Sequence, residues 1–540
     1  MARALNACWL FGMFLLVSQV VEATAAGLLW PLPESHHLTS AFGKYRRSHF
    51  HGGIDIGTNR RQLACVAVDD GWVERVAVTP GGYGRTIYLR LSDGRTAVYA
   101  HLSRFAPPVE SLLRERQLEA GTFRIDFAVD SLAVAFKRGE TIAWTGASGV
   151  GPPHLHFELR HGANQEDPFV EYEPNDTQRP VADGLRLVEA SNEVAAKYAQ
   201  GKEIRLQKGK ETLTGSCRVS RDSPFALLLK AHDPLPYGQH RPWTRCVLWQ
   251  EETKDTLADL RRENIDLLAQ TTLWASVDYL GWRDEKSEWW RLHAGKIGDF
   301  VPFRSLRNET ENFILDVYDR EGNRTRIRLQ LQEERHQASG SAEPLQNVAG
   351  VSKQELHGFE LTLHPEEKVP FLELVPTQSE SEIEVRPEIG LYYGATLLFR
   401  PENGDIERGT YLYERVGQAR RFLSAQYDSS EKRLTATVSH SGIFGVARDM
   451  TPPTLSVRVE GGKLFFKARD GQTGIDSRSI RCSADGQTAI AEYESEEGGG
   501  PIWTPFALKV GSHDILLQAE DKVGNEARLE KKMTVAKGKK

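Results

Sequence analysis

The amino-acid sequence predicts a mainly β protein made of several domains. At 540 residues the chain is too long for a single hydrophobic core. Its apolar segments are short continuous runs, as in residues 225–231, or strict polar–apolar alternations, as in residues 325–331. Gly, Asn, Asp and Pro separate these runs, as they do at the turns between antiparallel strands. We therefore expect antiparallel sheets throughout the chain.

The first 25 residues predict an export signal. Arg3 supplies a positive start, residues 9–17 form a short apolar core, and Ala23-Thr24-Ala25 fits the small-x-small cleavage pattern. The apolar run is too short for a comfortable membrane span, although an uncleaved anchor stays open as an alternative. We expect a mature chain that starts at Ala26, is periplasmic, envelope-associated or secreted, and has no stable membrane insertion after cleavage.

The charge balance argues against nucleic acid as a partner. The formal net charge is −6, from 68 basic and 74 acidic residues, and the sequence has no long basic run. In an oxidising compartment Cys217 and Cys246 could form a disulfide, because both fall within one expected domain.

A His-x-His pair predicts a metal site. His154 and His156 lie two residues apart on an expected strand, so both imidazoles face the same side. His51 and Asp55 lie upstream, four residues apart, and His101 stands in Tyr-Ala-His-Leu-Ser. A catalytic zinc takes about three protein ligands and leaves one position for water. A lone His-x-His would fit a half-exposed strand without function, so the order of the motifs carries the prediction.

These ordered motifs closely resemble the catalytic domain of the lysostaphin-like (LytM-type) zinc endopeptidases, which cut peptidoglycan. The matching segments are residues 40–43, 51–55, 66–68, 70–73, 81–84, 99–103, 146–149 and 151–158. The resemblance covers roughly residues 28–172 and implies an antiparallel β-sheet groove. It also implies one catalytic zinc ion held by His51, Asp55 and His156, with His101 and His154 as the catalytic histidines.

The chemistry of these residue types agrees with the roles that the resemblance implies. His154, on the same face as His156, can take a proton from water as a general base. His101 can donate to, or stabilise, a developing oxyanion. None of the five positions is substituted, unlike in the non-catalytic activators of the family. One departure is an enlarged connection, residues 105–132, in which residues 112–118 could form a short helix beside the groove and influence substrate range.

The remaining chain reads as three β modules. We expect a peptidase domain at 26–177, an immunoglobulin-like β-sandwich at 178–332, a linker at 333–349, a β module of unassigned type at 350–448 and a second immunoglobulin-like β-sandwich at 449–540. The third module should end in a strand over residues 439–446. A weak internal repeat supports the two sandwiches, since Ala-x-Asp (231–233, 468–470) and Asp-x-x-Gly-Asn (319–323, 521–525) occur in both.

Five tryptophans gather in the second expected domain. They are Trp243, Trp274, Trp282, Trp289 and Trp290. A carbohydrate platform is one use for them, but core packing or a domain interface is the favoured one.

The sequence as a whole predicts an exported zinc metalloendopeptidase that hydrolyses stem or cross-link peptides of peptidoglycan. The β modules would position or restrain the enzyme, or dock a protein regulator, and a spacer role stays open. One alternative is a non-catalytic activator or regulator of cell-wall hydrolases on the same fold. Another is a secreted bacteriolytic or general protease.

Overall fold

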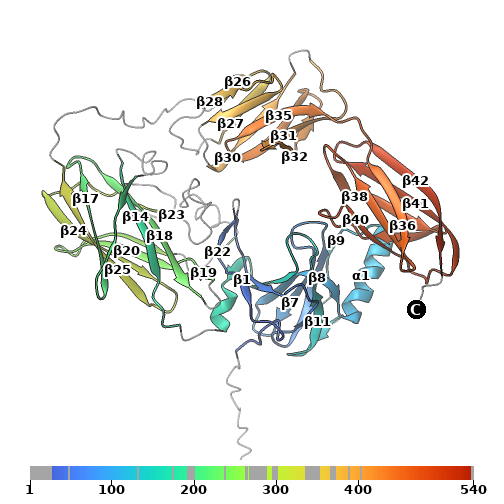
Figure 1. Cartoon of the computed structure of the whole chain (residues 1–540), viewed down its shortest axis with the longest axis horizontal. Coiled ribbons are helices and arrows are strands. Elements are labelled where there is room, and N and C mark those ends of the chain that lie inside the picture. Colours follow the sequence, from blue (N-terminus) through green and yellow to red (C-terminus); the bar gives the residue numbers. More distant parts are fainter. Residues whose placement is uncertain are drawn as a thin grey trace, which may run out of the picture.

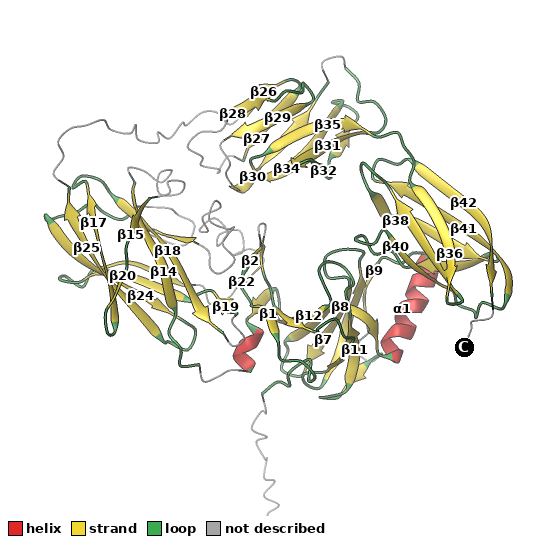
Figure 2. Ribbon diagram, in the orientation of Figure 1, coloured by secondary structure: helices red, strands yellow, loops and turns green. Residues whose placement is uncertain are grey.

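The computed structural model describes residues 27–46, 49–130, 133–172, 176–190, 201–235, 239–261, 265–266, 289–294, 302–334, 353–364, 373–386, 390–401 and 404–536. The expected export signal, Trp274, Trp282 and nearly all of the expected linker lie outside the described residues. Within these ranges the chain is mainly β, arranged in seven sheets with one α-helix and one short 3-10 helix, which confirms the predicted fold class. Figure 2 shows how strands dominate the molecule. We refer to residues 27–172, 176–334, 353–448 and 449–536 as the first, second, third and last units.

The first unit is a largely antiparallel sheet that carries all five predicted site residues. The strand order is β1 (Leu38–Ser40), β4 (Ile54–Gly57), β12 (His154–His161), β8 (Thr96–Phe105), β7 (Arg85–Leu91), β6 (Gly71–Val78) and β10 (Ala135–Phe136). The strands β5 (Ala64–Val66), β9 (Ile125–Ala128), β11 (Thr141–Thr145) and β13 (Asn164–Glu166) pair at its sides. A short hairpin, β2 (Tyr45–Arg46) and β3 (His49–Phe50), precedes β4, and the 3-10 turn η1 (Pro168–Glu171) follows β13.

Successive side chains of β12 point alternately into the hydrophobic core and towards the site. Leu155, Phe157 and Leu159 are buried in the hydrophobic core of the sheet. The residues between them therefore point to the opposite face, as the period of a strand requires. His156 lies opposite Asp55 of β4 in the register, so the two side chains meet across adjacent strands.

The enlarged connection of the first unit forms the helix α1 (Pro107–Ala120), which confirms and extends the predicted short helix. Two prolines open it, and Gly121 ends it in the left-handed conformation at φ 64°. Val109 and Leu113 bury one side of the helix. Figure 1 shows α1 between the first unit's sheet and the last unit.

The second unit packs two sheets together. One contains β15 (Lys202–Ile204), β14 (Val181–Glu189), β18 (Phe225–Pro234) and β19 (His240–Arg241), with β23 (Trp289–Leu292) also on β18. The other has the order β16 (Gln207–Lys208), β17 (Thr212–Val219), β25 (Arg324–Glu333), β24 (Thr310–Tyr318), β20 (Arg245–Gln250) and β21 (Thr256–Arg261).

The structure contradicts the possible Cys217–Cys246 disulfide, since both thiols are free. Cys217 lies on β17 and Cys246 on β20, three strand positions apart in one sheet. That is about 14 Å at the usual strand spacing, well beyond the reach of a disulfide.

The third unit consists of two five-stranded sheets. One is β26 (Lys353–Leu356), β27 (Phe359–Leu363), β30 (Gly390–Phe399), β34 (Arg433–His440) and β33 (Gln426–Asp428). The other is β28 (Glu373–Pro376), β29 (Glu382–Arg386), β35 (Ile443–Arg448), β31 (Thr410–Val416) and β32 (Ala419–Phe422). The single strand expected over residues 439–446 is wrong, because the chain leaves one sheet after His440 and enters the other at Ile443.

The last unit is a seven-stranded sheet assembly. Its order is β36 (Thr454–Glu460), β37 (Lys463–Arg469), β40 (Gly499–Trp503), β39 (Gln487–Ala491), β38 (Ile475–Ala484), β41 (Gly511–Asp521) and β42 (Glu526–Val535). The Asp-x-x-Gly-Asn turns of the second and last units make the same contacts. Asn323 donates to the backbone carbonyl of Asp176 at 2.8 Å, and Asn525 donates to that of Asp449 at 3.0 Å.

The second unit is anchored on one side of the first. Trp290 is 1% exposed, packs against Trp243 with ring centroids 5.7 Å apart, and stacks on Phe50 of the first unit at 5.8 Å. Arg241 forms an ion pair with Asp167 of the first unit at 3.3 Å. β22 (Ile265–Asp266) extends the first unit's sheet by pairing with β13. For Trp243 and Trp290, the favoured prediction of core packing and a domain interface is confirmed.

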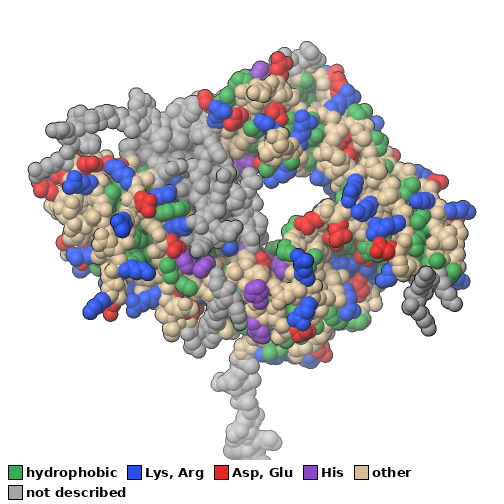
Figure 3. Space-filling model, in the orientation of Figure 1, with side chains coloured by type: hydrophobic (Ala, Val, Ile, Leu, Met, Phe, Trp, Pro, Cys, Tyr) green, Lys and Arg blue, Asp and Glu red, His purple; other side chains and the backbone are tan. Residues whose placement is uncertain are grey.

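The four units follow one another around a ring in Figure 1, so that the last unit returns to the first. An open space is visible between the units in the space-filling view (Figure 3). In the described part of the chain, no helix has the length and apolar character needed to span a membrane.

Candidate metal centre

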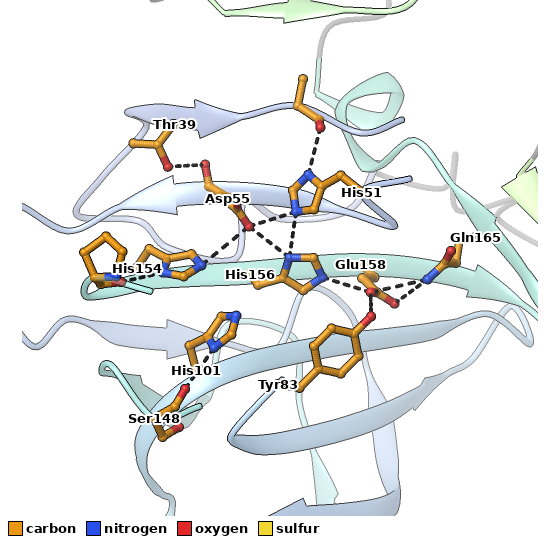
Figure 4. A network of polar contacts seen from close by, with 12 residues as sticks. Thr39, His51, Asp55, Tyr83, His101, Ser148, His154, His156, Glu158 and Gln165 are labelled. Carbon is orange, nitrogen blue, oxygen red and sulfur yellow. Dashed lines mark hydrogen bonds and ion pairs between the residues drawn. The ribbon is translucent and has the colours of Figure 1, made fainter. Parts of the chain in front are cut away.

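His51, Asp55 and His156 converge on one point of the first unit's sheet (Figure 4). His51 Nε2 lies 3.0 Å from Asp55 Oδ1 and 2.9 Å from His156 Nδ1, and His156 Nδ1 lies 2.9 Å from the same carboxylate oxygen. All three residues are at most 9% exposed. The structure thus brings together the three residues predicted as ligands.

The second nitrogen of each imidazole fixes its tautomer. His51 donates from Nδ1 to the backbone carbonyl of Ala41 at 2.8 Å, which leaves a lone pair on Nε2. His156 donates from Nε2 to Glu158 Oε1 at 2.8 Å, which leaves a lone pair on Nδ1. When both imidazoles are neutral, three acceptor atoms face one another. Two neutral imidazoles and one carboxylate are a donor set that fits a zinc ion.

The charges around the site favour an ionised Asp55. Burial alone would raise the pKa of this carboxyl group, but His51 and His156 outweigh it and lower the pKa well below its usual value. Burial alone would lower the pKa of His156, but Asp55 and Glu158 together raise it to about 9 in the metal-free protein. A proton therefore competes with any metal for His156 Nδ1.

Glu158 accepts a hydrogen bond from the His156 nitrogen that faces away from Asp55. It was not singled out in the sequence analysis. It is fully buried, accepts from His156 and from the Tyr83 hydroxyl, and pairs with Arg160 at 2.5 Å. Burial would raise its pKa, but His156 and Arg160 lower it to about 2, so it stays ionised. The Tyr83 ring also stacks on His156 at 5.2 Å. The sequence did contain a signal for Glu158. It lies two residues after His156, so its side chain falls on the same face of β12 as the two histidines.

His101 and His154 face each other beside this cluster, with ring centroids 4.4 Å apart. His154 Nε2 lies 3.6 Å from Asp55 Oδ1, and its Nδ1 donates to the carbonyl of Pro152 at 2.6 Å. His101 donates from Nδ1 to the carbonyl of Ser148 at 2.9 Å. Both rings thus present Nε2 as a proton acceptor towards the site.

His101 is held in an unusual state. Its backbone adopts φ 58°, a conformation that non-glycine residues rarely adopt and that clusters at functional sites. Burial, followed by the nearby His154, lowers the pKa of His101 to about 4. The imidazole is therefore neutral near pH 7 and can exchange a proton with a reacting group.

The loop 146–151 forms the wall next to the two histidines. Gly149 has φ +85°, and a Cβ atom there would lie 2.3 Å from the carbonyl oxygen of Gly82 and 2.5 Å from the nitrogen of Gly84. The loop consequently packs tightly on residues 82–84, which also carry Tyr83. The arrangement as a whole can hold a divalent metal and place two further imidazoles beside it.

The comparisons with known proteins point to the same class. No family model matches the chain. An "uncharacterized metalloprotease" of Haemophilus influenzae is 30% identical over 148 residues, which is 26% of this chain and 26% of that protein. Murein hydrolase activator NlpD of Escherichia coli is 27% identical over 140 residues, which is 26% of this chain and 30% of that protein. The catalytic domain of lysostaphin from Staphylococcus simulans is 22% identical, with 24% of this chain and 88% of that chain covered and a TM-score of 0.19.

The chain is thus similar to lysostaphin-like, LytM-type proteins, and its curated relatives include a metalloprotease and a murein hydrolase activator. The chain spans about a quarter of the length of the two curated relatives described above.

Proposed function

We propose that this protein is an exported zinc metalloendopeptidase that hydrolyses peptide bonds in the stem or cross-link peptides of peptidoglycan. The observation that supports this most is the convergence of His51 Nε2, Asp55 Oδ1 and His156 Nδ1 within 3.0 Å of one another, next to His101 and His154. The predicted export signal and the envelope location of relatives such as the outer membrane antigenic lipoprotein B of Haemophilus influenzae favour action at the cell envelope.

His51, Asp55 and His156 would hold the zinc ion, which polarises a scissile carbonyl and lowers the pKa of water towards neutrality when bound. His154, whose Nε2 faces Asp55, takes the proton of the attacking water as general base. In the tautomer described above His101 Nε2 carries a lone pair, so His101 can donate to the charge that develops on the substrate only after Nε2 has taken up a proton. Glu158 and the Ala41 carbonyl keep the two ligand imidazoles in the tautomers that coordination requires.

A non-catalytic activator of wall hydrolases is the second candidate, because NlpD is among the relatives. The presence of all five residues, with the tautomers of the four histidines set by neighbours, favours the enzyme. An activator has no need of two further histidines beside three ligands.

The test is incubation of the mature full-length protein with purified sacculi, with and without a zinc chelator. We expect release of soluble muropeptides that stops on chelation and returns with added zinc, and analysis of the products identifies the bond. Sacculi left intact by zinc-loaded protein, but cut once a separate wall hydrolase is added, would favour the activator instead.

A further inference from the structure

A loop of the last unit lies on the wall of the candidate active site. Glu494 Oε2 accepts from the backbone N–H of Gly149 at 3.1 Å, and Glu496 Oε1 accepts from that of Gly151 at 3.4 Å. Between them, Ser495 donates its N–H and its hydroxyl to the carbonyl of Pro80, at 3.1 and 2.6 Å. The loop therefore contacts both segments that border the histidines, from 345 and 415 residues away in sequence.

The peptide group between Ser148 and Gly149 links this loop to a catalytic candidate. Its N–H donates to Glu494, and its carbonyl oxygen accepts from His101 Nδ1 at 2.9 Å. One rigid, planar group thus makes a hydrogen bond at each end. Figure 4 shows the Ser148 end of this chain of contacts, pointing at the His101 ring.

We propose that Glu494 is a positioning residue for His101, acting through the Ser148–Gly149 peptide, so that the last unit completes the catalytic site. This inference rests on the proposed function of the first unit.

A carboxylate on the N–H side of a peptide polarises the carbonyl on the other side. Hydrogen bonds in such a chain strengthen one another, and the effect is larger where water is excluded. A stronger acceptor at Ser148 holds the His101 proton on Nδ1 and leaves Nε2 able to take up a proton. Burial raises the pKa of Glu494 to about 7, so the effect is largest above pH 7, where the carboxyl group is ionised. Glu494 thereby acts on His101 through the peptide, although it never touches the ring.

An ion-pair network holds Glu494 in place. Glu492, two residues earlier, pairs with Arg114 of α1 at 2.5 Å and with Arg85 of β7 at 3.4 Å. Glu110 of α1 contacts the same two arginines, at 3.0 and 3.4 Å. The Arg114 guanidinium also lies over the Trp503 ring, 5.0 Å from its centroid.

These charges alternate in sign and are largely buried, with Arg85 only 4% exposed. Geometry of this kind specifies one docked orientation more than it adds stability. The enlarged connection that forms α1 therefore serves as the platform on which the last unit is seated.

The experiment compares full-length wild-type protein with Glu494→Ala, Glu494→Gln and the control Glu497→Gln. Glu497 is an exposed neighbour in the same loop. Three quantities are measured: the ¹⁵N chemical shifts of the His101 ring, hydrogen exchange at the Gly149 amide, and kcat and KM on a soluble cross-linked peptide. The first two need no substrate turnover.

In Glu494→Ala we expect faster exchange at Gly149, a His101 ring that loses part of its Nδ1–H tautomer, and kcat reduced on the order of tenfold. KM should stay within about twofold, because the side chain of Glu494 is engaged by the Gly149 N–H and acts on His101. Glu494→Gln retains an acceptor oxygen and should recover most of the tautomer and of kcat. Glu497→Gln should match the wild type.

Unchanged His101 shifts and unchanged kcat in Glu494→Ala, in a wild-type protein that is active, would overturn the inference while leaving the proposed function intact. If the wild type is inactive but the ring shifts and the Gly149 exchange respond as expected, the proposed function fails and the coupling between Glu494 and His101 stands. A loss of kcat without any change in the His101 tautomer would reduce Glu494 to a structural contact and would also overturn the inference.

Discussion

Each imidazole of the candidate site is oriented by a hydrogen bond from the ring nitrogen that faces away from the site. For His156 the partner is a buried carboxylate, Glu158, whereas for His51, His101 and His154 it is a backbone carbonyl. A carboxylate partner raises the basicity of the nitrogen that binds metal more than a carbonyl does. His156 should accordingly be the strongest of the neutral ligands, and it is also the one for which protons compete most.

The division between ligands and bases can be tested residue by residue. His156→Ala should lose most bound zinc and all hydrolysis while the sheet stays folded, because the apolar face of β12 does not depend on metal. His154→Ala and His101→Ala should keep zinc and lose activity by about two to four orders of magnitude. Zinc content per chain and hydrolysis of sacculi are the measurements. Loss of all zinc from His154→Ala would make that residue a ligand.

The raised pKa of His156 predicts how zinc binding depends on pH. Below a pKa of about 9 the metal-free site holds a proton on His156 that zinc must displace. Zinc affinity should therefore fall about tenfold for each pH unit below that value and level off above it. The pKa of Asp55 is lowered, so Asp55 adds no further competition near neutral pH.

Glu158→Gln removes one of the two carboxylates that raise the pKa of His156, so the affinity should level off at a lower pH. Competition titrations against a zinc chelator across this pH range measure the effect. Glu166→Gln, on the adjacent strand β13, is the control and should keep the wild-type profile. Superimposable profiles for Glu158→Gln and wild type would contradict the assigned cause.

At the scale of elements, local patterns were predictable and sheet pairings were not. The His-x-His strand and the helix over residues 112–118 could be predicted, because strand alternation and helix periodicity depend on residues that are close in sequence. The break between β34 and β35 was missed, since Ser441-Gly442 is a weak turn signal and the change of sheet is a tertiary event. The possible Cys217–Cys246 disulfide was wrong for the same reason, because the order of strands in a sheet cannot be derived from short stretches of sequence.

The packing of the loop 146–151 can be tested by a substitution at Gly149. Gly149→Ala would place a Cβ against Gly82 and Gly84 at a φ of +85°, and should displace the Ser148 carbonyl from His101. Gly94 has nearly the same φ, +87°, and a Cβ added there would have nothing within 4 Å, so Gly94→Ala isolates the backbone strain.

We expect Gly94→Ala to cost about 1 kcal/mol of unfolding free energy and to leave hydrolysis unchanged. Gly149→Ala should cost roughly 1–3 kcal/mol more and reduce kcat strongly. Denaturant unfolding and peptide hydrolysis measure the two effects. Equal stability and equal activity of the two variants would show that the contact of Gly149 with residues 82–84 is unimportant.

At the scale of the whole molecule, two interfaces of different chemistry hold the ring around the first unit. The second unit is attached by the buried aromatic contact of Phe50 with Trp290, by a buried ion pair and by the pairing of β22 with β13. The last unit is attached by alternating charges and by hydrogen bonds to loop backbone. Apolar interfaces of this kind resemble a domain core, while polar ones are exchanged more readily with water. The contact of the last unit is therefore the one expected to open.

Arg114 is the residue through which that opening can be tested. Its side chain is 14% exposed and lies between Glu110 and Glu492, so Arg114→Glu would bring three carboxylates together and repel the last unit. We expect a larger radius of gyration in small-angle X-ray scattering, faster hydrogen exchange at Gly149 and lower kcat. Zinc content should stay unchanged, because the ligands lie on β4, on β12 and on the segment before β4, away from α1. Arg116→Glu is the matched control, since Arg116 lies on the same helix, is half exposed and pairs only with Glu119 among the contacts described. A scattering curve for Arg114→Glu that superimposes on that of Arg116→Glu would show that the charges do not hold the ring closed.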